Sequence, residues 1–291
     1  MKKLLILSGK GGTGKTTTAA AFVRFAQARA VADCDVDAPN LHLVMGQAAK
    51  STSEAFMGSE KAVADADACT GCGECARLCR FEAAKMEDGR CRINEYACEG
   101  CGVCARACPA GAISLQPDIA GTRELFIGEN GVFSTATLKM GRGNSGKLVT
   151  EVKNAMEAAA PATDLAIIDG SPGIGCPVIA SMNGVDLVLV VAEPSRSGRS
   201  DLERLVRTAR TFRTDIAVCV NKWDASPENA FAIRSWCEEE NIAFAGMIPY
   251  DKSASKAANA GKSIADIDCP ARNALSEIFG AVCAMLEMKG A

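Results

Sequence analysis

The sequence predicts an α/β protein with a doubly wound, mostly parallel sheet and a small α+β domain inserted into it. A glycine-rich loop near residue 10 separates an apolar run from an alanine-rich stretch. Apolar runs of strand length then alternate with helical stretches, and one window in which eight of the fifteen cysteines repeat interrupts this alternation. Because strands that alternate with helices bury a parallel sheet between helical layers, this order indicates a doubly wound fold.

The predicted elements follow the chain from end to end. Strands are expected at residues 4–7, 30–33, 165–168, 187–192, 216–220 and 243–248. Helices are expected at residues 15–29, 147–160, 198–212, 227–240 and 270–288. Residues 1–60 and 119–291 are predicted to form the sheet domain and residues 61–118 the insert, with a polar linker over about 46–66.

The composition narrows the class of protein. The net charge is −3 and no basic run stands out, so nothing argues for nucleic-acid binding. No apolar run approaches the ~20 residues of a membrane span, and the first residues are too short for a signal-peptide core, so a soluble, cytoplasmic protein is expected. Fifteen cysteines without a secretory signal indicate metal ligation and not disulfides.

Eight of the cysteines form an internal duplication. Each half reads C-x2-C-x2-C-x3-C, and a constant shift along the chain takes Cys69 of the first half to Cys98 of the second. This is the spacing of bacterial ferredoxins, in which three thiolates hold one [4Fe–4S] cluster and the fourth reaches the other cluster. The spacing disfavours zinc sites, which use separated C-x2-C pairs. The expected ligands are Cys69, Cys72, Cys75 and Cys108 for the first cluster, and Cys98, Cys101, Cys104 and Cys79 for the second.

One detail of this block differs between its halves. Pro109 follows the last cysteine of the second half, whereas Arg80 stands at the matching place of the first half. The missing proline weakens the case for Cys79 as a ligand. Asp88-Gly89 predicts a hairpin turn between the halves.

The glycine-rich loop fits the phosphate-binding pattern G-x4-G-K-[ST]. In this pattern backbone N–H groups surround phosphate oxygens, Lys15 reaches the β- and γ-phosphates, and Thr16 ligates Mg²⁺. A second string, at residues 141–148, ends in Leu148 where the hydroxyl is needed and is interpreted as a loop. The residues expected to bind the nucleotide here are Gly9, Gly11, Gly12, Thr13, Gly14, Lys15, Thr16 and Thr17.

Lys10 makes this loop "KGGTGKTT", which resembles the MinD/ParA group of dimeric P-loop ATPases, related to the nitrogenase iron protein and Mrp-type ATPases. The resemblance implies that Lys10 reaches the nucleotide of a partner subunit, where its charge stabilises the leaving phosphate. It therefore implies a homodimer, or a heterodimer with a paralogue.

The same resemblance implies roles for the acidic residues. In "VADCDVDAPNLHL", Asp35 would orient the attacking water, and Asp33 or Asp37 would support Mg²⁺. In "DLAIIDGSPGIGC", Asp169 would hold the Mg²⁺ shell. Cys176 lies where the nitrogenase iron protein places a bridging cysteine, but no second cysteine matches that protein's other ligand.

The base of the nucleotide is expected to be adenine. Asn221 belongs to an N-K-x-D string that reads guanine in GTPases, but the resemblance implies that this asparagine reads adenine. Pro249 and Tyr250 would flank the base. The apolar setting of His42, the only histidine, favours a place in the core.

Nearly the whole chain therefore resembles a MinD-superfamily ATPase with an inserted two-cluster ferredoxin domain. The resemblance implies an ATPase that couples nucleotide-driven dimer closure to electron transfer toward a redox partner. Two alternatives stay open: a carrier that delivers iron–sulfur clusters or another metal cofactor to a partner, and a redox-sensing positioning ATPase. Because the insert follows the segment of Asp35, nucleotide-driven movement there could change the cysteine sites.

Overall fold

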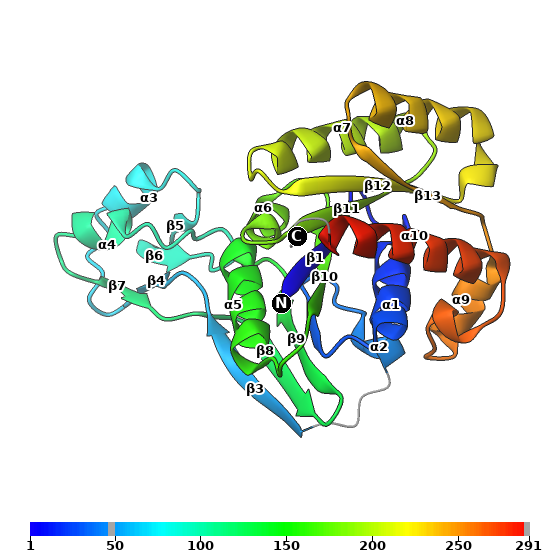
Figure 1. Cartoon of the computed structure of the whole chain (residues 1–291). Coiled ribbons are helices and arrows are strands. Elements are labelled where there is room, and N and C mark those ends of the chain that lie inside the picture. Colours follow the sequence, from blue (N-terminus) through cyan, green and yellow to red (C-terminus); the bar gives the residue numbers. More distant parts are fainter. Residues whose placement is uncertain (46–49, 288–291) are drawn as a thin grey trace. The chain divides into compact units, whose positions relative to one another are not determined.

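The computed structural model describes residues 1–45 and 50–287, which form two compact units (Figure 1). The first unit comprises Met1–Ser53, Arg123–Thr137 and Ser145–Ala291. The second comprises Glu54–Thr122 and Leu138–Asn144. The border between the units falls within three strands, so the insert is continuous with the edge of the main sheet.

The main sheet has nine strands in the order β13-β12-β11-β1-β10-β2-β9-β8-β3. Every pairing from β13 to β9 is parallel, which confirms the predicted mostly parallel sheet. The strands are β1 (Lys2–Ser8), β2 (Ala30–Asp33), β3 (Lys50–Met57), β8 (Ile119–Gly128), β9 (Gly131–Leu138), β10 (Leu165–Pro172), β11 (Leu187–Ala192), β12 (Asp215–Asn221) and β13 (Ala243–Ile248).

Helices cover both faces of this sheet, with α1 and α10 on one face and α5 to α8 on the other (Figure 1). This division follows from right-handed crossovers, because the chain moves from β1 toward β2 but returns from β9 toward β13. Phe22 and Phe279 pack edge to face where α1 meets α10. The helices are α1 (Lys15–Ala26), α2 (His42–Met45), α5 (Ser145–Ala159), α6 (Cys176–Met182), α7 (Arg196–Arg210), α8 (Pro227–Glu239), α9 (Lys252–Asn259) and α10 (Pro270–Glu287).

The second unit repeats one pattern twice. Its elements are β4 (Lys61–Ala64), α3 (Glu74–Leu78) and β5 (Ala84–Glu87), followed by β6 (Arg90–Ile93), α4 (Val103–Ala107) and β7 (Ile113–Gln116). The shift that takes Cys69 to Cys98 also takes the first residue of each element to that of its counterpart, and the strands pair antiparallel as β4 with β7 and β5 with β6. Asp88 and Gly89 both have positive φ between β5 and β6, so the predicted hairpin turn is confirmed.

The core of the second unit consists mainly of small residues. Its buried members are Ala62, Cys75, Ala83, Ala84, Cys91, Cys98 and Ile113. A unit of this size rarely gains enough stability from apolar burial alone, and small domains commonly add a metal or disulfides. A core of alanines and cysteines therefore indicates that something else stabilises this unit.

The linker predicted for residues 46–66 is wrong for residues 50–57 and 61–64, which form β3 and β4. β3 is an edge strand with mostly polar side chains, and within 51–57 only Phe56 is buried, so it lacks the apolar run of an inner strand. Residues 46–49 of that prediction lie outside the described residues. The loop predicted for 141–148 is likewise wrong at its end, because α5 begins at Ser145 and buries Leu148.

His42, expected in the core, is instead exposed in the short helix α2. Leu41 takes the buried position, and Leu43 is exposed as well, so the apolar letters around His42 do not mark one buried face. The first helix also ends earlier than predicted, at Ala26, because Gln27 adopts a left-handed conformation with φ 46°.

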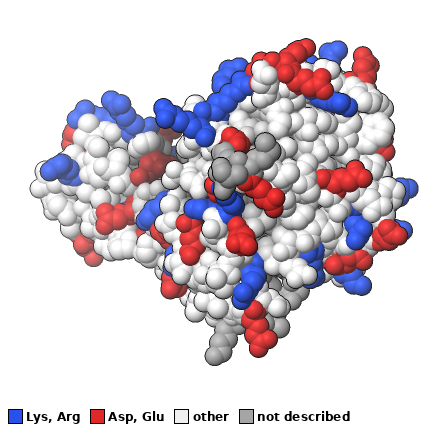
Figure 2. All heavy atoms as spheres, viewed as in Figure 1, with Lys and Arg blue, Asp and Glu red and all other residues white. Residues whose placement is uncertain are grey.

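The surface carries side chains of both charges. Acidic and basic side chains both occur across the face shown in Figure 2. Among the described residues, no helix is long and apolar enough to cross a membrane.

Candidate functional site

The glycine-rich loop connects β1 to α1, as the sequence predicts. Gly12 and Gly14 have φ of 79° and 97°, a region that favours glycine. A Cβ atom on Gly14 would lie 2.2 Å from Nδ2 of Asn221. That Nδ2 donates a hydrogen bond to the carbonyl oxygen of Thr13 (2.7 Å). Asn221 therefore supports the loop, and its role in reading adenine stays a prediction.

Lys15 is the buried cation of this site. Its Nζ donates to Oδ1 of Asp169 (2.7 Å) and lies 3.6 Å from Oδ2 of Asp35. The hydroxyl of Thr16 donates to the other oxygen of Asp169 (2.7 Å). Burial opposes the charge of Lys15, but the neighbouring carboxylates of Asp169 and Asp35 outweigh it and raise its pKa. The structure thus brings a charged amine, a hydroxyl and two carboxylates together at the loop.

The three aspartates after β2 have different surroundings. Asp33 accepts hydrogen bonds from the backbone N–H groups of Asp35, Asn40 and Leu41, each 3.0 Å long, so it shapes the loop that follows. Burial and the nearby Asp169 carboxylate raise the pKa of Asp33 to about 7. Asp35 is buried beside Lys15, and burial raises its pKa. Asp37 is exposed. Asp35 is therefore the one best placed beside the phosphate-binding residues.

Lys10 has a partner within its own chain. Its Nζ lies 2.7 Å from Oε2 of Glu193, which follows β11. Lys222 lies 3.5 Å from the other oxygen of Glu193 and donates to the carbonyl oxygen of Gly12 (3.0 Å). The hydrogen bond from Lys10 lowers the pKa of Glu193. Glu193 therefore connects Lys10 and Lys222 at the loop.

The segment predicted to bind the base lies after β13. The backbone N–H of Tyr250 donates to Oδ1 of Asp224 (2.7 Å), while the Tyr250 ring is exposed and Pro249 is half-buried. A cavity of about 200 Å³ opens beside the loop. Its lining includes Thr16 and Thr17 of α1, residues of α2 and α9, and Lys262. This cavity offers space beside the phosphate-binding loop, but contact of Pro249 and Tyr250 with a base stays a prediction.

Cys176 is exposed at the first residue of α6. Over the part of the chain that the structure describes, it belongs to no group of three or more metal-ligating side chains. We therefore assign no metal-binding role to Cys176.

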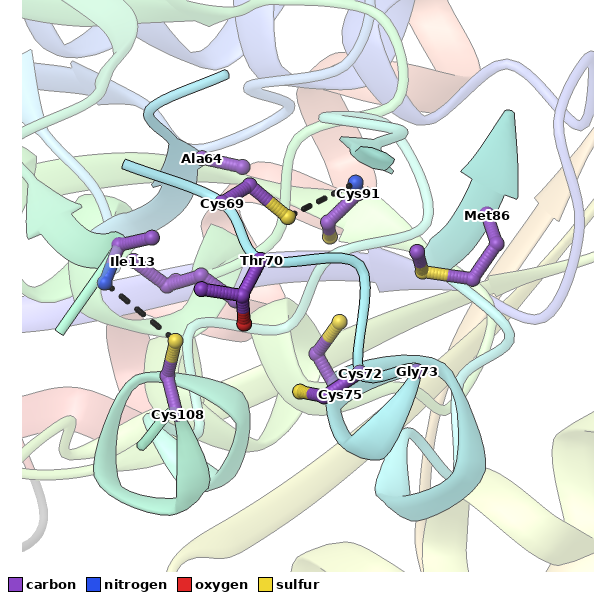
Figure 3. A pocket seen from close by; sticks show the side chains of 11 residues that line it. Ala64, Cys69, Thr70, Cys72, Gly73, Cys75, Met86, Cys91, Cys108 and Ile113 are labelled. Carbon is purple, nitrogen blue, oxygen red and sulfur yellow. Dashed lines mark hydrogen bonds between the residues drawn. The ribbon is translucent and has the colours of Figure 1, made fainter. Parts of the chain in front are cut away.

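The eight cysteines of the repeat line two separate cavities in the second unit. Cys69, Cys72, Cys75 and Cys108 line the first (Figure 3). Cys79, Cys98, Cys101 and Cys104 line the second. The two groups are the same two sets that the spacing predicts, including the exchange of Cys79 and Cys108 between the halves.

Backbone N–H groups point at sulfurs in both cavities. The N–H of Cys91 donates to Sγ of Cys69 (3.5 Å), and the N–H of Ala112 donates to Sγ of Cys108 (3.3 Å). In the second cavity, the N–H groups of Ala62 and Ala83 donate to Cys98 and Cys79 (3.4 and 3.3 Å). Such hydrogen bonds stabilise thiolates, the form that binds metals.

Within residues 1–45 and 50–287, no group of three or more His, Cys, Asp or Glu side chains is arranged to hold a metal ion. The ligands of a four-iron cluster need a different arrangement. Each thiolate binds a different iron, so the sulfurs surround a cage and do not meet at one ion. Each cavity includes four of the repeated cysteines in its lining, a donor set that suits such a cage.

The sheet, the glycine-rich loop and the cluster around Lys15 together define an α/β nucleotide-binding protein. The chain belongs to the family described as the CobQ/CobB/MinD/ParA nucleotide binding domain, which matches residues 4–264. It is thus a MinD/ParA-family protein of the P-loop class.

Relatives and solved structures agree with this membership. The uncharacterized protein MJ0578 of Methanocaldococcus jannaschii is 34% identical over 224 residues, covering 76% of this chain and 78% of that protein. An ATP-binding protein of the same organism, MJ0547, is 25% identical over 282 residues, covering 94% and 85%. The septum site-determining protein MinD of Pyrococcus horikoshii, solved with Mg-ADP, shares the fold with a TM-score of 0.60 and 17% identity, covering 99% of this chain and 98% of that one.

Two residues of these sites are absent from the sequence-based predictions. Glu193 is a single acidic residue after an apolar strand, and it lies outside the phosphate-binding, aspartate, N-K-x-D and cysteine motifs. Cys91 lies outside the cysteine pattern, yet the shift that relates Cys69 to Cys98 would have aligned it with Ala62. Comparing the halves position by position would have revealed this difference.

Proposed function

We propose that this chain is an ATP-binding and ATP-hydrolysing iron–sulfur protein that couples nucleotide-dependent dimer closure to electron transfer. In this proposal residues 1–60 and 119–291 form the ATPase, and residues 61–118 form a two-cluster ferredoxin-like insert. The observation that carries the proposal is the lining of two separate cavities by the two sets of four cysteines. A cytoplasmic location is part of the proposal, since reducing surroundings keep thiols free.

The nucleotide half rests on the groups at the loop. Lys15 would turn from Asp169 to the β- and γ-phosphates, which leaves Asp169 and Thr16 to hold Mg²⁺. Asp35 would then orient a water and take its proton. The water oxygen bonds to the γ-phosphorus while the bond to the β-bridging oxygen breaks, releasing ADP and phosphate. ATP is favoured because the relative MJ0547 is described as ATP-binding.

The dimer rests on Lys10, whose position in the loop is shared with dimeric ATPases related to the nitrogenase iron protein and Mrp-type ATPases. In a dimer, Lys10 of one subunit would leave Glu193 and stabilise the charge on the phosphates bound by the other subunit. The partner subunit is a second copy or a paralogue.

The iron–sulfur half rests on the chemistry of the two cavities. Each cavity includes four of the repeated cysteines, and backbone N–H groups donate hydrogen bonds to their sulfurs. The core of the second unit is too small to be stable by apolar packing alone. When bound, [4Fe–4S] clusters would accept and release single electrons at these cysteines. A redox partner protein would exchange those electrons.

A second candidate function is delivery of a cluster or another metal cofactor to a partner protein. Cys72 and Cys101, one in each cavity, are exposed, which would let an incoming thiol reach them. The remaining cysteines of the two sets are at least partly buried.

The test is anaerobic reconstitution of the full chain, followed by iron and sulfide analysis and by ATP turnover with oxidised and reduced protein. We expect iron for two clusters, and a turnover rate that changes on reduction. Cys75→Ser and Cys104→Ser should each remove one cluster, whereas Cys283→Ser, on α10 outside the repeat, should remove none. A wild-type chain that binds no iron would contradict the proposal. Loss of iron to an apo-acceptor during turnover would favour delivery.

A further inference from the structure

The two cysteine cavities are related residue by residue through the internal duplication. In the first cavity the N–H of Cys91 donates to Cys69, and in the second the N–H of Ala62 donates to Cys98. The shift that matches the two acceptors, Cys69 and Cys98, also matches the two donors, Ala62 and Cys91. The backbone of the two sites is equivalent at this position.

The side chains at this position differ. Cys91 is 3% exposed and Ala62 is 5% exposed, so both are buried against their cavities. Cys91 lines the first cavity in addition to the four predicted ligands, and Figure 3 shows it among their sulfurs. Its thiol therefore belongs to the lining that the predicted ligands form, at the position where Ala62 places a methyl group in the second cavity. The first cavity therefore holds five cysteines and the second holds four.

A thiol close to a ligand sulfur has a defined electronic effect. An S–H group is a weak hydrogen-bond donor. Hydrogen bonds to the sulfurs of an iron–sulfur site are among the features that set its reduction potential, because they stabilise the more negative, reduced form. The methyl group of Ala62 has no hydrogen to donate, so the second cavity lacks this contact.

We propose that Cys91 is a positioning residue that makes the two cysteine sites unequal, holding the first at a higher reduction potential than the second by donating a hydrogen bond from its thiol to a ligand sulfur. This inference rests on the proposed function, because it requires that both cavities hold clusters. Unequal sites would be reduced in a fixed order, the first before the second.

The test is an anaerobic redox titration of the reconstituted full chain, followed by EPR, with iron and sulfide counted in each sample. In Cys91→Ala, we expect unchanged iron and sulfide and a more negative potential for one site only. In Cys91→Ser, the hydroxyl can still donate to a ligand sulfur, so the potential should stay closer to that of the wild type. A residue that only fills space would not distinguish these two variants in this way.

The repeat supplies a matched control at Ala62. Ala62→Cys places a thiol at the equivalent position of the second cavity and should raise the potential of the other site. The double variant Cys91→Ala with Ala62→Cys should exchange the behaviour of the two sites. If Ala62→Cys does not fold, the two variants at Cys91 still decide the question.

Two results would overturn the inference. In the first, Cys91→Ala keeps its full iron content and both potentials stay where they are in the wild type. In the second, Cys91→Ala and Cys91→Ser each lose one cluster, which would make Cys91 an iron ligand. A wild-type chain without iron is a different result, since it would contradict the proposed function itself.

Discussion

At the scale of single residues, the proposed dimer requires Lys10 to leave Glu193 before it reaches the nucleotide of the other subunit. The pair is 2.7 Å long, and its side chains are 38% and 26% exposed. Exposed ion pairs contribute about 0–1 kcal/mol, so Glu193→Gln should tighten the ATP-dependent dimer by up to about fivefold. Sedimentation velocity with a non-hydrolysable ATP analogue and Mg²⁺ measures this change.

The matched control is Glu203→Gln, which removes an exposed acid paired with Arg199 on α7. It should leave dimer formation as in the wild type. If Glu193→Gln weakens the dimer, Glu193 contributes to the interface itself and does not merely retain Lys10.

The sequence predicted which residues lie together at the phosphate-binding loop. It did not predict the hydrogen bonds and ion pairs that each of them makes. Lys15, Thr16 and Asp169 do lie together, because a motif and a strand end fix their places in a parallel sheet. The different roles of Asp33 and Asp35 depend on how the loop after β2 turns, and three acidic letters within five positions carry no signal for that turn.

At the scale of elements, α5 connects the nucleotide-binding unit to the chain of the second unit. A Cβ atom on Gly146 would lie 3.2 Å from the carbonyl oxygen of Cys176, so the start of α5 packs closely on the start of α6. The residues just before α5, Leu138–Asn144, belong to the second unit.

Arg142 ties this segment to the rest of the second unit. Its guanidinium pairs with Asp118 (3.1 Å) and Glu95, and lies over the ring of Tyr96, 5.3 Å from its centroid. Because hydrogen bonds between charged groups contribute roughly 1.5–3 kcal/mol, Arg142→Gln should speed local amide exchange by at least about tenfold. Hydrogen–deuterium exchange of the full chain should show this at residues 138–144 and 94–98.

Arg77→Gln serves as the control for that experiment. Its partner Glu74 is on the same helix, α3, and the loss of this pair should leave exchange at 138–144 unchanged. Unchanged exchange in Arg142→Gln would mean that other contacts hold the segment.

Some strands of the main sheet could be predicted from the sequence and others could not. The predicted strands at 187–192 and 243–248 coincide with β11 and β13. β11 is apolar and buried throughout because both faces of an inner parallel strand are covered, whereas β13 is an edge strand. The sequence did not predict β3, β8 and β9. These strands extend the sheet beyond β2, and their mixed polar and apolar residues resemble a linker more than an inner strand.

At the scale of the whole molecule, the two units should melt separately. ATP with Mg²⁺ binds only the folded first unit and should raise its transition, by about 2.7 kcal/mol of stability at a hundredfold excess over Kd. If the proposed clusters are bound, anaerobic chelation of iron should lower the transition of the second unit alone, because metal binding contributes to folding. Differential scanning calorimetry of the full chain measures both. One transition that responds to both treatments would show that the units unfold together.

The two ends of the cysteine repeat are joined by a backbone hydrogen bond. The N–H of Gly58, just after β3, donates to the carbonyl oxygen of Asp118, just before β8, at 3.0 Å. The chain therefore enters and leaves the cysteine repeat at nearly the same point, as it would at the tip of a hairpin. A turn of a few residues could replace everything between these two positions without stretching the sheet. The cysteine repeat is in this sense a module that protein engineering could exchange or remove at a single hairpin.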